Sequence, residues 1–523
     1  MDDRSMASIN LGRRSTLAAV AAGTAGLLLP STARATVWGS IPATAGTVWA
    51  TPPDLRILEI HLYGGLSMWE TFYARAPGAA NRFRGFDAEV AALPFAGCDA
   101  GFTDPAPSPF ATDANGRPVH LGPATRPLWK PSILGKMRVV VLAHEFQPHE
   151  AAIPLMMTGQ RLGNPKLAGL GAAIQHHFVS RDIDSGPPPP RPYSYVLWPE
   201  TFSFPTDNLQ ASAAVGLHPA YARPLVLKVG AGLPGFLGSL TRSGIRGDRD
   251  ALLHQYVDQY SASLRHGSML STTPPGRTRS KGFSAFESSS AMVFGAASLN
   301  GLLTAAGSPA PLPLPNELAC PNGGATTTFE NMPGHGIKLA AYLLAQTGAN
   351  APRYVCVIDK GMQTASGGGA YDTHGGPHVN VTSVNLFNIC KTLRQLVDAG
   401  TLNLANTMVV LTTEFGRTPD RTGSGRNHWP EGFCQVLIGG PATRGVSGAL
   451  LDGNVAGVPA GDDGRADPAH HFKPADLRAA ILTACGIMPF ENDAYAVPDI
   501  SFSTAASTHG DLMRGLKSQV LGA

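Results

Sequence analysis

This 523-residue sequence has few cysteines and no close pairs of them. Its six cysteines lie singly along the chain, and none forms a Cys-x-x-Cys motif, which argues against a zinc ribbon or a dithiol redox centre. Charge is also scarce, because Asp, Glu, Lys and Arg together make up 15% of the residues and the formal net charge is +3. Since no basic block or stripe is present, we expect no nucleic-acid partner.

Long apolar runs are rare as well. The run from Leu17 to Leu29 has thirteen residues, too few to cross a bilayer comfortably. It follows Arg13-Arg14 and leads to Ala33-Arg34-Ala35, a small-x-small cleavage pattern. We therefore predict an export signal peptide over residues 1–35, either of the twin-arginine type, which the arginine pair favours, or an ordinary secretory signal. No later stretch has 18 or more apolar residues, so we expect a periplasmic or secreted mature protein without a membrane span.

The rest of the chain has a globular composition, with 43% hydrophobic residues, 60 glycines and 44 prolines. Apolar runs of strand length alternate with helical segments, which predicts an α/β fold with a largely parallel central sheet. We treat residues 36–523 as one domain, with proline-rich joints around a helical and irregular inserted cap at about 187–315. The predicted strands are Leu55–Tyr63, Met137–Ala143, Tyr193–Trp198, Arg353–Asp359, Met408–Thr413 and Cys434–Ile438, and helices are predicted at Leu167–Phe178, Asp248–His266, Gly334–Thr347, Val384–Ala399 and Lys473–Cys485.

Side chains that bind metals gather near the ends of the later strands. Asp372, His374 and His378 lie in a glycine-rich loop after one predicted strand. Glu414 directly follows the next strand, and His428 comes shortly before the one after that. In an open α/β sheet, ligands bind beyond the carboxyl ends of the strands, so we expect these side chains to meet there.

Carboxylates and imidazoles in this arrangement are typical ligands of a divalent ion, with zinc as the first choice and manganese or calcium as alternatives. Arg417 could clamp an anion with its guanidinium, and His149 could bind metal or stabilise an anionic transition state. Taken singly, each residue has a simpler interpretation as a loop histidine, a helix cap or an ion-pair partner. Together they predict a site with Asp372, His374, His378, Glu414 and His428 as metal ligands and with His149 and Arg417 as catalytic residues.

One pattern in the chain resembles a known family. A strand leads to Asp372-Thr373-His374, the next strand leads to Glu-Phe-Gly-Arg-Thr-Pro at 414–419, and His428 precedes a strand that ends in Gly439-Gly440. This pattern resembles the bacterial proteins grouped as DUF1501, which are usually placed in the alkaline phosphatase/sulfatase-like superfamily. The resemblance covers most of the mature chain. It implies an alkaline-phosphatase-like three-layer α/β/α sandwich in which the candidate ligands hold one or two divalent metals.

Two positions depart from the pattern that this resemblance implies. Relatives carry an Asp shortly after the first Gly-Gly, where superfamily members bind metal, whereas this chain has Ser67, with Glu70 as a displaced substitute. The second segment should read Ser-His near the superfamily's nucleophile, whereas this chain reads Pro148-His149, and Pro148 has no nucleophilic atom. Ser67 and Thr158 are the hydroxyl alternatives. A covalent mechanism needs an activated nucleophile beside the metal, and these substitutions argue against it.

Two functions are compatible with these features. The first is an exported metal-dependent hydrolase of phosphate or sulfate esters, acting on a small-molecule or polymer-borne anionic ester, and the retained ligand clusters favour it. The second is a catalytically degraded member of the same fold that acts as a periplasmic or cell-surface binding or structural protein. Ser67 and Pro148 favour this second function.

Overall fold

A computed structural model describes most of the unit Gly39–Ala523, and the preceding unit, Met1–Trp38, lies outside the described residues. The described ranges are 39–51, 54–75, 106–160, 169–183, 195–199, 225–229, 332–346, 352–361, 371–374, 378–419, 425–451, 464–490, 500–501 and 508–523, with a few positions between 252 and 259.

An eight-stranded sheet forms the centre of the described part. In spatial order its strands are β12 (Gly445–Ser447), β4 (Met137–Leu142), β11 (Phe433–Gly439), β8 (Thr407–Thr412), β1 (Arg56–Leu62), β7 (Tyr354–Asp359), β5 (Tyr195–Pro199) and β6 (Leu225–Val229). β1 pairs in parallel with β8 on one side and with β7 on the other. β11 is antiparallel to both of its neighbours, β8 and β4, and the other described strands of this sheet share one direction. The chain is therefore a mixed α/β protein with a largely parallel central sheet.

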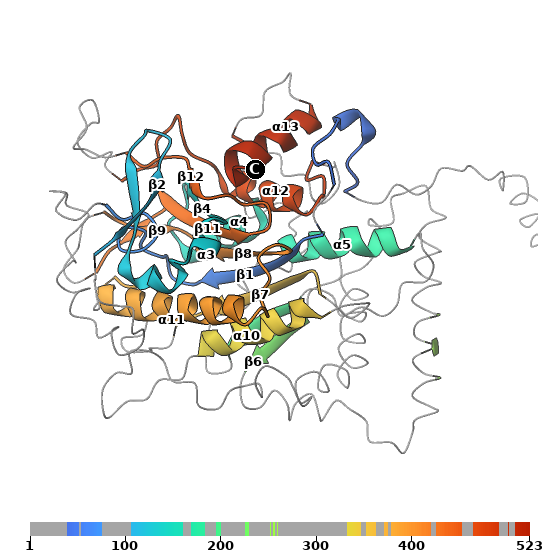
Figure 1. Cartoon of the computed structure of the whole chain (residues 1–523), viewed down its shortest axis with the longest axis horizontal. Coiled ribbons are helices and arrows are strands. Elements are labelled where there is room, and N and C mark those ends of the chain that lie inside the picture. The colour runs from blue at the N-terminus through green and yellow to red at the C-terminus, as the bar shows by residue number, and fades with distance from the viewer. Residues whose placement is uncertain are drawn as a thin grey trace, which may run out of the picture. The chain divides into compact units, whose positions relative to one another are not determined.

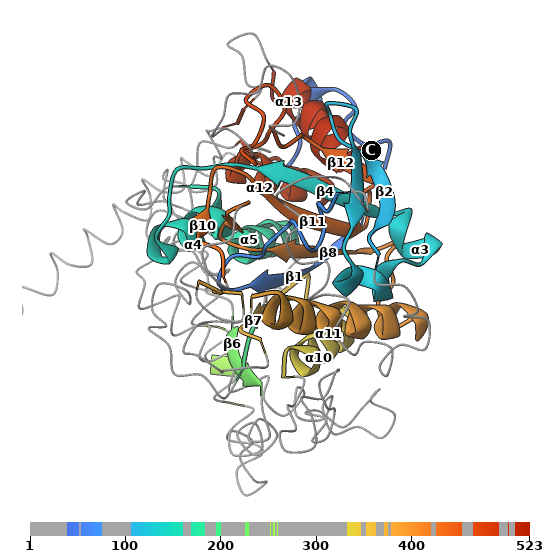
Figure 2. The ribbon, with the colours of Figure 1, turned by 90° about the vertical axis from the view of Figure 1, so that its left-hand side faces the viewer.

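Helices cover both faces of this sheet (Figure 1). α10 (Met332–Ala345) and α11 (His378–Asp398) lie on one face. α4 (His149–Thr158), α5 (Leu170–Ile183) and α12 (Pro474–Ala484) lie on the other face, and Figure 2 shows α13 (His509–Gly515) beyond α12. Because both faces are covered, the central strands β7 and β8 are buried along their whole length, and β1 is buried from Ile57 to Leu62.

Shorter elements complete the described part. The strands β9 (Gly416–Arg417) and β10 (His428–Trp429) form a small antiparallel ladder that sets His428 opposite Arg417. The other short elements are the hairpin β2 (Ser108–Thr112) with β3 (Pro118–Leu121), the helix α3 (Pro131–Leu134), the 3₁₀ turns η1 (Ala43–Ala45) and η4 (Pro123–Leu128), and the C-terminal turn η6 (Leu516–Leu521).

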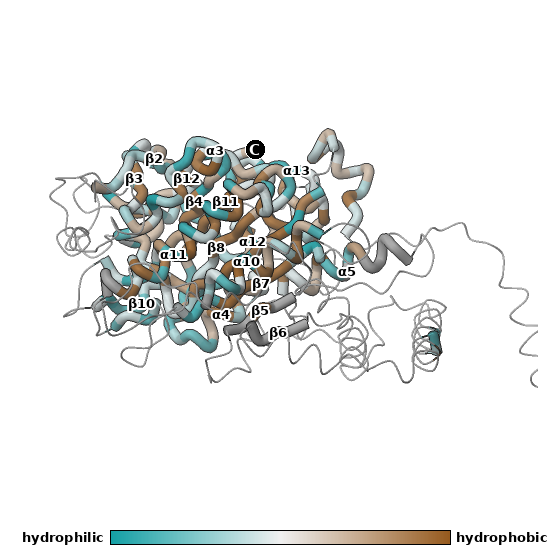
Figure 3. Tube along the Cα trace, turned by 60° about the horizontal axis from the view of Figure 1, so that its bottom comes forward, coloured by the Kyte–Doolittle hydropathy of each residue, from teal (hydrophilic) through white to brown (hydrophobic). Residues whose placement is uncertain are grey.

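The core is apolar with a small number of compensated charges. Figure 3 shows hydrophobic residues along β8, β11 and α12, in the middle of the layers. Glu59 of β1 is fully buried there and pairs with Arg478 of α12 at 2.7 Å. The hydroxyls of Tyr354 and Thr412 also donate to this carboxylate, from the strands on either side. A buried charge is tolerated when it is paired and hydrogen-bonded in this way.

The α/β class and the largely parallel sheet predicted from the sequence are confirmed. The described strands β1, β4, β7, β8 and β11 begin and end within one residue of the predicted limits. Helix α11 begins at His378, six residues before the predicted start at Val384. Its first turns contain the polar residues Asn380, Thr382 and Ser383 beside Val379 and Val381, which weakens the apolar periodicity on which the prediction depended.

Other predictions fall partly outside the described residues. These include the signal peptide at 1–35, Cys98, Cys320 and most of the proposed cap at 187–315. Within that cap range the structure describes β5 and β6, which extend the parallel sheet, and the limits of the insertion stay a prediction. The four described cysteines are buried free thiols. Among the helices of the described part, none is long and apolar enough to cross a membrane.

Candidate metal centre

The candidate residues meet beside the carboxyl ends of the central strands. β1 continues into Tyr63 and a Gly-Gly turn, and β8 continues into Glu414. β4 leads through a short segment to His149, the first residue of α4. Asp372 lies in the segment after β7, and His428 belongs to β10. The topology therefore delivers side chains from four separate connections to one edge of the sheet, as the sequence predicted.

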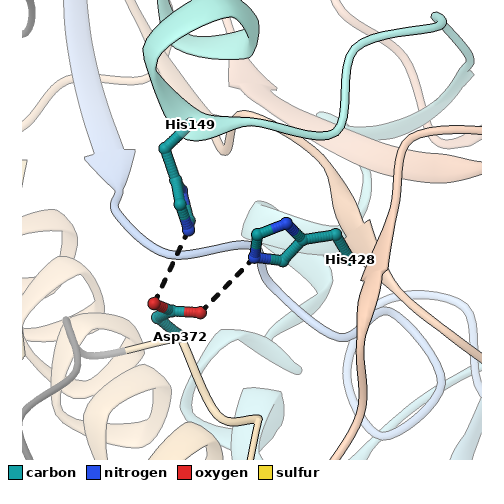
Figure 4. A group of neighbouring side chains, drawn as sticks. All are labelled: His149, Asp372 and His428. Carbon is teal, nitrogen blue, oxygen red and sulfur yellow. Dashed lines mark ion pairs between the residues drawn. The ribbon is translucent and has the colours of Figure 1, made fainter.

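His149, Asp372 and His428 form a group of three metal-capable side chains (Figure 4). One ligand atom of each lies within 4.8 Å of the other two. His149 Nε2 is 3.5 Å from Asp372 Oδ2, and His428 Nε2 is 3.6 Å from Asp372 Oδ1. The carboxylate thus faces both imidazole rings. All three side chains are partly exposed, although the His149 Nε2 atom itself is buried and has no hydrogen-bond partner among the described residues.

These spacings fit a bound divalent ion. A tetrahedral ion with bonds of about 2.0–2.2 Å holds its ligand atoms about 3.3–3.6 Å apart. The separations of 3.5 and 3.6 Å, each to a different oxygen of Asp372, are close to that spacing, and one ligand atom of each residue lies within 4.8 Å of the other two. Two imidazoles and one carboxylate with a further open position are also the donor set of catalytic rather than structural zinc sites. The residues present therefore fit the ion that the sequence implied.

His374 approaches the same group from the solvent side. Its Nε2 is 2.8 Å from His428 Nε2 and 3.1 Å from Asp372 Oδ1. Its side chain is 45% exposed, more than those of the other three residues. His374 could therefore serve as a fourth ligand or exchange protons with solvent. His378 is the first residue of α11, and its side chain lies outside the described residues.

Arg417 supports Asp372 from the buried side. Its guanidinium is fully buried and donates to Asp372 Oδ1 at 2.6 Å and to the main-chain carbonyls of Gly64, Gly65 and Arg426. Burial works against the Asp372 charge, but hydrogen bonds from His149, His428 and Arg417 outweigh it and lower the pKa of the carboxyl group well below its usual range. In this arrangement Arg417 orients the carboxylate of Asp372, and its buried guanidinium does not face an anion in solvent.

Glu414 lies on the opposite side of His149 from Asp372. Glu414 is fully buried, and its Oε1 is 2.7 Å from His149 Nδ1 and accepts a hydrogen bond from Gly64 N at 2.7 Å. Burial works against the charged form of His149, but its contacts with Asp372 and Glu414 outweigh burial and raise the pKa of the ring to about 9. Without a metal, the His149 ring is therefore protonated at neutral pH.

Aromatic side chains hold the two imidazoles. Tyr63 stacks on His149 with ring centroids 5.4 Å apart. Phe415 packs against both rings, at 4.9 Å from His149 and 4.2 Å from His428. Tyr371, next to Asp372, is anchored by its hydroxyl, which donates to the buried carboxyl of Asp359 at 2.8 Å. These contacts fix the positions of the ligand atoms before any ion binds.

Gly64 allows the turn after β1 to pass directly against the Asp372 main chain. Its φ is +114°, and a Cβ atom there would lie 2.3 Å from Asp372 N. We expect Gly64→Ala to lower the free energy of unfolding by roughly 3 kcal/mol or more, because it adds a main-chain clash to left-handed strain of about 1–3 kcal/mol. Gly116→Ala is the matched control, since its φ is +74° and nothing lies within 4 Å of its Cβ. Urea denaturation compares the free energies of unfolding of the two variants. An equal loss in both would contradict the close approach of Gly64 to the Asp372 main chain.

The two departures from the family pattern have structural roles. Ser67 is fully buried, and its hydroxyl donates to Glu70, which pairs with buried Arg426 at 2.5 Å. Pro148 is the N-cap of α4 and has an extended conformation, so the helix starts at His149. At the other end of α4 the Thr158 hydroxyl donates to Pro154 O at 2.6 Å. Each of the two hydroxyls named from the sequence is thus engaged in a buried contact of its own.

The structure brings most of the predicted residues together. It also distinguishes the residues that face the candidate metal position from those that lie behind them, which the sequence did not. His149 joins the ligand group, whereas Glu414 lies behind it. Tyr63 and Phe415 were not selected as site residues from the sequence, although Tyr63 directly precedes the first Gly-Gly and Phe415 lies within the Glu-Phe-Gly-Arg-Thr-Pro motif. The predicted residues that meet here are His149, Asp372, His374, Glu414, Arg417 and His428.

Comparison with known families agrees with the motifs. Residues 338–496 match the model of the family described as "Protein of unknown function (DUF1501)". The matched segment contains Asp372, Glu414, Arg417 and His428, whereas His149 lies before it. This match supports the DUF1501 resemblance. No curated protein matches the chain.

Proposed function

We propose that this protein is an exported, metal-dependent hydrolase of phosphate or sulfate esters. The observation that carries the proposal is the group His149, Asp372 and His428, whose side chains are partly exposed and which offer one ligand atom each within 4.8 Å of one another, with the buried His149 Nε2 atom lacking a hydrogen-bond partner among the described residues. Two imidazoles and a carboxylate suit zinc first, with manganese or calcium as alternatives.

The residues of the chain prepare this site in three ways. Arg417 keeps Asp372 ionised and oriented. His149 offers Nε2 as a ligand atom once its proton has left, while its other nitrogen stays on Glu414. His374 is exposed beside Asp372 and could accept a proton from an attacking water. A divalent ion held there would act as a Lewis acid on an ester oxygen and lower the pKa of water.

The charge of the site favours an anionic substrate. Asp372 and Glu414 contribute negative charges, and buried Arg417 contributes a positive one. With neutral histidines and a divalent ion, the site carries about one net positive charge. A phosphate or sulfate ester compensates that charge, whereas a neutral ester does not.

Fold and location belong to the same proposal. The family match, the largely parallel sheet and the helices on both of its faces support an alkaline-phosphatase-like sandwich. The Arg13-Arg14 pair and the apolar run after it support a twin-arginine signal over residues 1–35 and a periplasmic or secreted protein.

One observation favours the alternative, a binding or structural protein on a degraded catalytic fold. Ser67 and Glu70 stand where the family pattern places a metal-binding Asp, and both are tied into a buried contact with Arg426. Pro148 likewise serves to start α4 and supplies no nucleophile. A chain with these substitutions could retain an ion and bind an anionic polymer without hydrolysing it.

Metal analysis and an ester screen separate the two functions. We expect the mature protein, purified without chelator or affinity metal, to contain about one divalent ion per chain by plasma mass spectrometry, since the described residues contain one such ligand group. We also expect it to hydrolyse aryl phosphates or aryl sulfates, with activity lost in chelator and restored by the ion.

The remaining outcomes are equally informative. A folded protein that binds the ion but hydrolyses neither ester would support the alternative function. A folded protein that takes up no ion on reconstitution would exclude both a working metal site and the hydrolase.

A further inference from the structure

Glu414 contacts only groups inside the protein. Its Oε1 faces His149 Nδ1 and Gly64 N, each at 2.7 Å. Its Oε2 is 3.3 Å from Thr413 Oγ1 and 3.7 Å from His61 Nε2. The carboxylate has no exposed surface and is not part of the three-residue ligand group. Its charge therefore acts on the site through a neighbouring residue and not by direct contact with an ion or substrate.

The neighbour through which it acts is His149. An ionised carboxylate can only accept hydrogen bonds, so the hydrogen of the His149–Glu414 contact must lie on Nδ1 of the ring. With Nδ1 occupied, Nε2 is the nitrogen left to bind a metal, and it is the one that faces Asp372. Tyr63 and Phe415 pack against the ring and keep it in this orientation.

His61 lies on the interior side of Glu414. It belongs to β1, is fully buried, and neither of its ring nitrogens has a hydrogen-bond partner among the described residues. Burial lowers the pKa of the ring, so His61 is neutral and adds no competing charge beside Glu414. The row His61, Glu414 and His149 thus runs from the core outward, with one ionised carboxylate between two imidazoles.

We propose that Glu414 is a positioning residue that fixes the tautomer and the orientation of His149 and thereby raises the affinity of His149 Nε2 for a metal. The proposal rests on the proposed metal site for its effect on affinity, but the contact itself can be tested without an ion. Partners of this kind behind a ligating histidine change metal affinity by about 10–100-fold.

The test compares Glu414→Gln with Glu59→Gln in the full mature chain. Both substitutions neutralise a fully buried carboxylate of the same sheet region, but Glu59 pairs with Arg478 and has no contact with His149. Zinc and cobalt affinities are measured by competition with a chromophoric chelator. We expect a loss of about 10–100-fold for Glu414→Gln and less than about threefold for Glu59→Gln.

A second readout needs no metal. A hydrogen held between His149 Nδ1 and a buried carboxylate should exchange slowly and give a far-downfield proton resonance in the metal-free protein. We expect this resonance to disappear in His149→Gln and in Glu414→Gln and to persist in Glu59→Gln.

Each result has one meaning. Unchanged affinity and an unchanged resonance in Glu414→Gln would overturn the positioning role. If Glu414→Gln lost as much metal affinity as a ligand substitution does, Glu414 would be a direct ligand. If Glu59→Gln lost as much metal affinity as Glu414→Gln, the effect would be general destabilisation of the fold. If the wild-type chain shows the resonance but binds no metal, the positioning contact stands and the proposed function fails.

Discussion

Asp372→Asn should lower the affinity of the protein for zinc by at least about 1,000-fold, or about 4 kcal/mol. Asp372 contacts four residues of the site, since His149, His374, His428 and Arg417 each have an atom within 3.6 Å of its carboxylate. Partners that act on a ligand indirectly change affinity by about 10–100-fold, so loss of a charged direct ligand should exceed that range. The Asn side chain keeps the size of Asp and can still accept from Arg417, which limits damage to the fold.

The matched control for this substitution is Asp467→Asn. Asp467 also contacts a histidine, His470, at 3.2 Å and accepts from Asn115, but it lies outside the ligand group. Metal content by plasma mass spectrometry and affinity by chelator competition should change in Asp372→Asn alone. If Asp372→Asn still bound one ion per chain tightly, the assignment of Asp372 as a metal ligand would be wrong.

Metal affinity should rise about tenfold per pH unit between pH 7 and 9 and then level off. The cause is His149, whose pKa is raised to about 9 because Asp372 and Glu414 outweigh its burial. An ion must displace the ring proton to use Nε2, and this competition weakens binding about 100-fold at pH 7 relative to pH well above 9. Calorimetry at pH 7 in two buffers of different ionisation enthalpy should show about one proton released per ion bound.

The stability of the metal-free protein should change in the opposite direction. A histidine whose folded pKa exceeds its unfolded value of about 6.5 contributes stability that is fully present below pH 6.5 and is lost as pH rises through 9. The raised pKa of His149 corresponds to about 3 kcal/mol. Urea denaturation from pH 6 to 10 should show this loss in the wild type and not in His149→Gln. An identical pH dependence in His149→Gln, for stability or for residual metal affinity, would assign the effect to another group.

The sheet could be predicted from the sequence because its strands carry their own signal. β7 and β8 are mostly apolar runs of strand length, β1 alternates between apolar and polar residues, and the alternation of strands with helices gives the parallel topology. The placement of metal-capable residues after strands then predicts that they meet, since parallel strands bring their carboxyl ends to one edge.

The roles of the individual residues in the site could not be predicted from the sequence in the same way. Glu414 and His149 are both polar residues after strands, and only the folded geometry shows that Glu414 is buried behind the ring of His149. Arg417 reads as an exposed anion clamp in the sequence, yet its main-chain carbonyl partners at Gly64 and Gly65 lie far away along the chain. A sequence pattern states which side chains are near a strand end, but it does not state which way each one is packed.

The contacts of Arg417 also determine when the centre can form. Its guanidinium joins Gly65, which lies 352 positions earlier, and the Gly64–Glu414 hydrogen bond spans 350 positions. A growing chain cannot make these contacts until it has been synthesised beyond Arg417, and closures over such lengths are slow steps of folding. An ion bound at the proposed site would therefore be acquired late, by a chain in which the segments after β1 and β8 have already met.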